Sequence, residues 1–90
     1  MARTRVVHCK KESYDVYIGR PSKWGNPFNI GRDGTRDEVI LKYYKWIATQ
    51  PHLMGSLNEL KGKVLGCWCK PQPCHGDVLV YLIEGGELNR

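Results

Sequence analysis

The chain has 90 residues, enough for one compact domain with a limited core, so we expect a single domain spanning residues 1–90 with an ordered core from about residue 5 to residue 85. Hydrophobic residues make up 41% of the sequence and charged residues 26%, a globular balance that excludes a disordered chain. The formal net charge of +5 is compatible with an anionic partner, a nucleotide or a nucleic acid, although scattered cations can also serve solubility alone.

Two short runs of β-branched and aromatic residues stand near the start of the chain. Residues 5–9 and 14–18 are separated by a polar segment, which predicts two strands that could pair as a hairpin. Residues 20–34 then contain two prolines and three glycines, so no regular structure is expected there. Trp24 and Phe28 argue against disorder in this stretch, and we interpret it as an ordered binding loop.

The middle of the chain predicts two helices. Thr35 and Glu38 have the spacing of a capping box, and apolar residues at helical spacing follow as far as about Thr49. Pro51 should end this helix or begin the next one. Three leucines at helical spacing then predict a second, shorter helix that ends at Gly62.

The last third of the chain predicts a strand and a helix. Residues 63–69 have the apolar character of a buried strand, which the following prolines interrupt. A final helix should run from His75 or Gly76 to about Ile83 and be closed by Gly85 and Gly86, with a frayed tail at residues 87–90. This order of elements predicts a single small α/β or α+β domain, with about three strands in one sheet covered by about three helices.

The most informative segment for chemistry lies between residues 67 and 75, which hold three of the four cysteines and one of the three histidines. Three sulfurs and one imidazole nitrogen are the number and kind of ligands that structural zinc prefers. The predicted zinc ligands are Cys67, Cys69, Cys74 and His75. The adjacent pair Cys74 and His75 is an awkward chelator, and His8 or Cys9 could replace one ligand if the first strand lies beside this one.

Two other interpretations of this segment stay open. In the first, the protein is an enzyme in which Cys69 or Cys74 is the nucleophile, His75 is its base or ion-pair partner, and Asp77 orients His75. In the second, the cysteines are reduced thiols that fill a small core. The metal site, the catalytic thiol and the core-filling thiols all stay open, so the sequence leaves undecided whether the protein is an enzyme.

The loop that follows the second predicted strand is a further candidate site. Its cations could pair with a phosphate, its aromatic ring could stack on a base, and its side-chain amide could form hydrogen bonds with the polar edge of that base. The predicted ligand-binding residues are Arg20, Lys23, Trp24 and Asn26. Trp24 can equally anchor the loop to the core.

Four motifs taken together resemble a family of small proteins from phages and bacteria that is catalogued only as a domain of unknown function. These motifs are Tyr17–Arg20, Lys23–Phe28, Cys67–Cys69 and Pro73–Asp77. The resemblance covers residues 6–83 and implies that the loop and the cysteine segment belong to one site. It implies no activity.

The favoured hypothesis is a zinc-stabilised module whose cysteine segment and loop form one pocket for a nucleotide or nucleic acid. The alternatives are a small enzyme acting on a nucleotide or another phosphate-bearing substrate, and a phage protein that binds a host protein without a ligand. No apolar run is long enough to cross a bilayer, and no signal-peptide core follows residue 5. We therefore expect a protein of the cytoplasm, the host cytoplasm if a phage encodes it, where thiols stay reduced.

Overall fold

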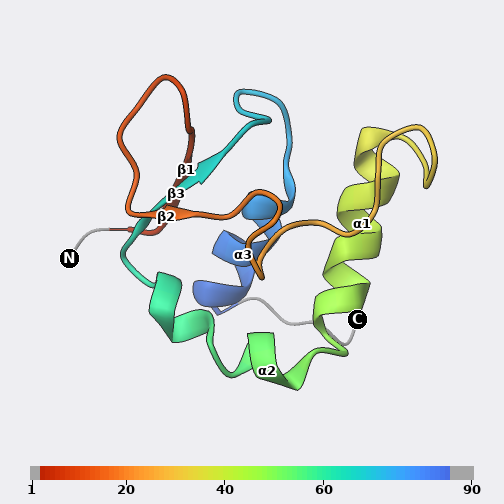
Figure 1. Cartoon of the computed structure of the whole chain (residues 1–90). Coiled ribbons are helices and arrows are strands. Elements are labelled where there is room, and N and C mark those ends of the chain that lie inside the picture. Colours follow the sequence, from red (N-terminus) through yellow and green to blue (C-terminus); the bar gives the residue numbers. More distant parts are fainter. Residues whose placement is uncertain (1–2, 86–90) are drawn as a thin grey trace.

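A computed structural model describes residues 3–85 of the chain (Figure 1). Three short strands form one parallel sheet in the order β1-β3-β2: β1 (Arg5–His8), β2 (Val16–Tyr17) and β3 (Val64–Cys67). Leu65 of β3 lies opposite both Val6 and Val16. The first two strands therefore do not form a hairpin, because β3 lies between them and all three strands run in the same direction.

Three α-helices and one 3-10 helix complete the fold: α1 (Arg36–Ile47), α2 (Pro51–Met54), the 3-10 helix η1 (Leu57–Leu60) and α3 (His75–Ile83). The predicted capping box is present, because Thr35 Oγ1 accepts a hydrogen bond from the Glu38 amide at 3.3 Å. The predicted second helix is divided into α2 and η1 at Gly55, and glycine is a poor helix former. Gly85 has a φ of 97°, the left-handed conformation that closes a helix, whereas Gly86 and residues 87–90 lie outside the described residues.

The helices pack in a layer beside the sheet (Figure 1). α3 contacts β1 and η1, and α1 contacts α3 and α2. β3 is buried over most of its length, as expected for the central strand of a parallel sheet. A Cβ at Gly76 would come within 2.8 Å of the Ile18 side chain, so a glycine is required where the first turn of α3 approaches the strands. The structure confirms the predicted α/β fold with three strands and three α-helices.

Three loops leave the sheet at its carboxyl edge, and two of them lead to helices. Of these two, the first follows β2 and leads to α1, and the second follows β3 and leads to α3. Trp24 anchors the first loop: its side chain is buried, and its carbonyl accepts a hydrogen bond of 2.7 Å from the hydroxyl of Tyr43 in α1. In parallel α/β sheets, ligands bind outside the carboxyl ends of the strands, so this edge is where a site is expected. Within the described residues, no helix is both long enough and apolar enough to cross a membrane.

Candidate functional site

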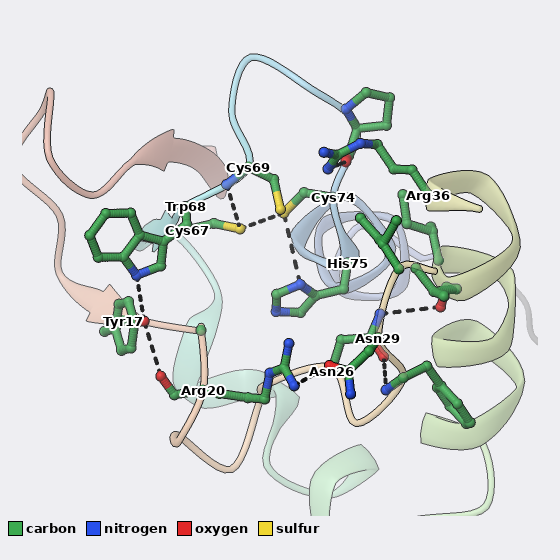
Figure 2. A pocket seen from close by; sticks show the side chains of 16 residues that line it. Tyr17, Arg20, Asn26, Asn29, Arg36, Cys67, Trp68, Cys69, Cys74 and His75 are labelled. Atoms are coloured by element: carbon green, nitrogen blue, oxygen red, sulfur yellow. Dashed lines mark hydrogen bonds between the residues drawn. The ribbon is translucent and has the colours of Figure 1, made fainter. Parts of the chain in front are cut away.

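Three cysteines converge at the carboxyl end of β3 (Figure 2). Cys67 is the last residue of β3, Cys69 lies two positions further on, and Cys74 is the N-cap of α3. The loop between them folds back, so that the sulfur atoms of Cys67 and Cys74 lie 2.8 Å apart. All three sulfur atoms lie within 4.8 Å of one another. The structure thus brings together the three cysteines predicted as metal ligands.

His75 adjoins this cluster, and a backbone contact determines its tautomer. Its Nε2 atom lies 2.8 Å from the carbonyl oxygen of Ile18. Because a carbonyl oxygen can only accept a hydrogen bond, Nε2 carries the proton, and the Nδ1 atom of the neutral ring keeps its lone pair. Nδ1 lies 3.9 Å from the Cys74 sulfur. His75 is nevertheless outside the group of three cysteines whose sulfur atoms all lie within 4.8 Å of one another. A hydrogen bond from the other ring nitrogen to a backbone carbonyl is typical of metal-binding histidines.

The three thiols influence one another's ionisation. The hydrogen bond from Cys74 lowers the pKa of Cys67 to about 5, and the amide of Cys69 adds to this effect. The same hydrogen bond raises the pKa of Cys74, which keeps its proton and is also buried. Burial and the charge on Cys67 raise the pKa of Cys69. The bond between Cys67 and Cys74 thus favours ionisation of Cys67 over ionisation of the other two thiols.

The sulfur atoms fit a metal ion that prefers thiolate ligands. With zinc–sulfur bonds of about 2.3 Å in a tetrahedron, sulfur ligands lie about 3.8 Å apart, so Cys67 and Cys74 would have to separate by about 1 Å. Cys69 is only partly buried and gives an ion a route to the cluster. The suggested substitutes His8 and Cys9 are not in the group of close ligand atoms found among the described residues, and His8 Nδ1 instead accepts a hydrogen bond from the Lys10 amide at 3.0 Å.

A cavity of about 470 Å³ extends from the cysteines toward α1 (Figure 2). Its volume lies within the range of about 300–1,000 Å³ that small-molecule sites occupy. The last residues of β2 and β3, the loop before α1, the first turns of α1 and the start of α3 all contribute to its walls. Its apolar walls are formed by Phe28, Ile30, Val39, Ile40 and Pro73. The cavity therefore joins the cysteine cluster to the predicted binding loop.

Two arginines also line this cavity. Arg20 follows β2 and donates a hydrogen bond to the side-chain oxygen of Asn29. Arg36 begins α1, and its Nη1 donates to the carbonyl oxygen of Pro73 at 3.2 Å. The Arg36 side chain also acts on the Cys69 thiol, whose pKa it lowers against the larger effect of burial. Two guanidinium groups beside an apolar wall are suited to a ligand that carries a phosphate or carboxylate.

The other residues predicted as ligand contacts have different positions. Asn26 lines the cavity, but its amide is already bonded to the backbone of Val39 at 3.2 Å and of Phe28 at 2.9 Å. Trp24 is 2% exposed and belongs to the core, so it anchors the loop and does not face a ligand. Lys23 is not among the cavity residues, and its ammonium group forms an ion pair with Glu59 at 3.1 Å.

Asp77 does not orient His75 as one interpretation suggested. One of its oxygens accepts a hydrogen bond from the Cys74 amide at 3.1 Å, which caps α3. The other oxygen forms an ion pair with Lys70 at 2.9 Å. Asp77 therefore supports the start of the helix that carries Cys74 and His75.

Besides its apolar walls, the cavity has four lining side chains with hydrogen-bonding groups that were not predicted as site residues: Tyr17, Asn29, Arg36 and Trp68. Arg36 carried a usable signal, because it stands at the first position of a helix that directly follows the predicted binding loop. Trp68 carried another, since a tryptophan between two cysteines at the end of a strand is placed at the same edge as the cysteines. Tyr17 belongs to one of the motifs that carry the family resemblance, whereas Asn29 gave no signal that separated it from ordinary loop residues.

Comparisons with known proteins give a family but no activity. A family model described as "Domain of unknown function (DUF4326)" matches residues 2–85. An uncharacterized 12.4 kDa protein in the nrdA-td intergenic region of Enterobacteria phage T4 is 36% identical over 85 residues, covering 89% of this chain and 77% of that protein. An uncharacterized protein of Acanthamoeba polyphaga mimivirus is 38% identical over 91 residues, covering 81% of this chain and 69% of that protein. No solved structure matches the chain.

Proposed function

The chain belongs to the family described as a domain of unknown function (DUF4326), and from its site we propose that it is a zinc-stabilised protein that binds a nucleotide in the cavity beside the cysteines. One observation carries this proposal. The three clustered cysteines line the same cavity as Arg20 and Arg36, so a metal site and an anion site share one wall. Zinc would hold this wall in place, and the arginines would bind the phosphate of the ligand.

The metal part of the proposal rests on the chemistry of the ligands. Cys67, Cys69 and Cys74 supply three thiolates, and His75 Nδ1 is free to supply the fourth ligand after a small movement of its ring. A closed set of three sulfurs and one nitrogen is typical of structural zinc. Thiolate ligands need a reducing compartment, which is why we propose the cytoplasm as the location of the protein.

The nucleotide part rests on the size and character of the cavity. Its volume suits a small molecule, its apolar wall from α1 and the preceding loop suits a base or sugar, and its two guanidinium groups suit a phosphate. The net charge of +5 favours an anionic ligand over a cationic one.

The enzyme alternative receives less support. A nucleophilic cysteine needs an accessible thiolate, but the pKa values of both Cys69 and Cys74 are raised. Cys67 has the lowered pKa, but it is only 1% exposed. This pattern favours a cluster of ligands over a single reactive thiol.

Metal content of variants tests the metal site. We expect one zinc ion per purified chain by native mass spectrometry. The variant Cys74→Ser should lose it, because serine is a poor zinc ligand but still a good N-cap, so α3 keeps its capping residue. The matched control is Cys9→Ser, which removes the cysteine outside the cluster and should keep the metal. Full zinc in Cys74→Ser, or no zinc in the unmodified chain, would contradict the proposal.

Calorimetric titration tests the ligand. Nucleoside 5′-monophosphates should bind more tightly than the corresponding nucleosides, since only the former offer a phosphate to Arg20 and Arg36. Removing zinc with a chelator should weaken this binding, because the metal supports the cavity wall. Equal affinity for nucleosides and their monophosphates would show that the arginines do not bind the phosphate.

A further inference from the structure

Trp68 is 54% exposed although both of its neighbours in the sequence belong to the cysteine cluster. Its indole is held in one orientation. Its Nε1 donates a hydrogen bond of 2.8 Å to the hydroxyl oxygen of Tyr17 (Figure 2), and its ring meets the ring of His8 edge to face, with centroids 5.9 Å apart. An exposed ring that is fixed in this way offers a flat surface without a further entropic cost for ordering it.

A positive charge lies over this ring. The ammonium group of Lys10 lies 5.5 Å from the centre of the indole, and Lys11 follows in the same exposed loop after β1. The Tyr17 hydroxyl that holds the indole also donates to the backbone carbonyl oxygen of Arg20 at 3.1 Å, while the Arg20 guanidinium bonds the side chain of Asn29 in the cavity. The fixed indole therefore lies beside Lys10 of the loop after β1, and Tyr17 links it to the backbone of a cavity arginine.

We propose that Trp68, Tyr17, His8 and Lys10 form a stacking face for single-stranded nucleic acid. One base stacks on the Trp68 indole, while Lys10 and Arg20 contact the phosphates on either side of that base. A duplex keeps its bases stacked on each other and cannot offer one to the ring, which is why the ligand is a single strand. An apolar protein partner would meet the ammonium group of Lys10 at the ring.

This inference rests on the proposed function in one respect, because it takes the cavity to hold a nucleotide. Trp68 also lines that cavity. The base on the indole and the nucleotide in the cavity would therefore be neighbours in one strand. The ligand is then a polymer and not a free nucleotide. The cavity contributes one bound nucleotide, and the stacking face contributes the next.

Fluorescence anisotropy with labelled oligothymidylate of about eight nucleotides tests this inference, since single-strand binders occupy about 4–16 nucleotides. Unlabelled thymidine monophosphate is measured in parallel by competition. We expect the oligomer to bind more tightly than the monophosphate, and Trp68→Ala to weaken oligomer binding by between about 5-fold and about 100-fold. Trp68→Phe should restore part of the loss, because phenylalanine still stacks.

The matched control is Tyr81→Ala, which removes an aromatic side chain of similar exposure on α3 and should leave oligomer binding unchanged. Thermal unfolding of each variant identifies any loss caused by misfolding. Lys10→Gln should lower the salt dependence of binding by about one released counterion. The same measurement with an RNA oligomer of equal length tells whether the single strand that binds is DNA or RNA.

The outcomes separate the two proposals. If the monophosphate binds but the oligomer binds no more tightly, the nucleotide site stands and the stacking face is wrong. If the oligomer binds with equal affinity to Trp68→Ala and to the unmodified chain, the stacking face is also wrong. If the oligomer binds through Trp68 and the monophosphate does not bind, the stacking face stands and the cavity proposal fails.

Discussion

Arg36 differs from most cations of this chain because its guanidinium is half-buried and already directed by the protein. It bonds the Pro73 carbonyl in the loop that carries the cysteines, and it lines the cavity, so it is held beside both. A guanidinium held in place loses little freedom when it binds a phosphate, and hydrogen bonds to charged groups are the stronger ones.

We therefore expect Arg36→Gln to weaken binding of a nucleoside monophosphate by about tenfold, measured by calorimetric titration. Arg36→Lys should recover only part of this affinity, because lysine keeps the charge but not the planar pair of donors. The control is Lys45→Gln, which removes the same charge from the exposed last turn of α1, outside the cavity. Equal losses in Lys45→Gln and Arg36→Gln would mean that net charge alone attracts the ligand.

For single residues, the sequence predicted which side chains could bind a metal or ligand better than it predicted where those side chains lie. The cysteines were found because thiols close together in the sequence are rare and chemically distinct. Trp24 and Lys23 were predicted as ligand contacts because their residue types suit that role, yet Trp24 is in the core and Lys23 is paired with Glu59. The direction in which a loop side chain points depends on the packing of distant segments, and no local pattern records it.

The secondary-structure elements show a different balance. The start of α1 was predictable because the capping box is a contact between Thr35 and Glu38, three positions apart. The division of the next helix at Gly55 was missed, although glycine gave a local reason for it. The pairing of β1 and β2 with β3 was not predictable, because it joins residues about 50 to 60 positions apart and depends on the crossover through α1.

The capping box of α1 also predicts a dependence on pH. The Thr35 amide donates to the Glu38 carboxylate at 2.8 Å, and this bond lowers the pKa of Glu38 below its ordinary value of 4.5. The carboxyl group of Glu38 thus binds its proton more weakly in the folded protein than in the unfolded chain. The stabilising contribution is present above about pH 4.5 and is lost as the pH falls through the lower pKa of the folded state.

Urea unfolding across this pH range checks the prediction. Glu38→Gln should have a lower urea midpoint than the unmodified chain at pH 7, and the two midpoints should converge as the pH falls below the folded pKa of Glu38. Asp33, whose pKa is also lowered, is present in both proteins and does not affect the comparison. A constant difference between the two midpoints would mean that the charge of Glu38 contributes nothing to the cap.

For the molecule as a whole, size sets the importance of a metal. A 90-residue chain can build only a limited core, and one outer strand of the sheet, β2, has two residues. The cysteine cluster links the end of the central strand to the start of α3, and α3 in turn contacts both β1 and α1. An ion bound there would connect the sheet to the helices through the loop of residues 68–74, between β3 and α3.

We expect removal of zinc by a chelator to lower the thermal midpoint by about 10–20 °C. This range follows from about 2.7 kcal/mol of linkage at a free zinc concentration 100 times the dissociation constant, and from a shift of about 4–8 °C per kcal/mol in a domain of this size. Circular dichroism of the helices measures the midpoint. Cys9→Ser should show the same fall, whereas Cys74→Ser should start from the lower midpoint and not change further, because its cluster has already lost a ligand. If zinc leaves without a change in the midpoint of the unmodified chain, the ion is bound to the protein but does not stabilise its fold.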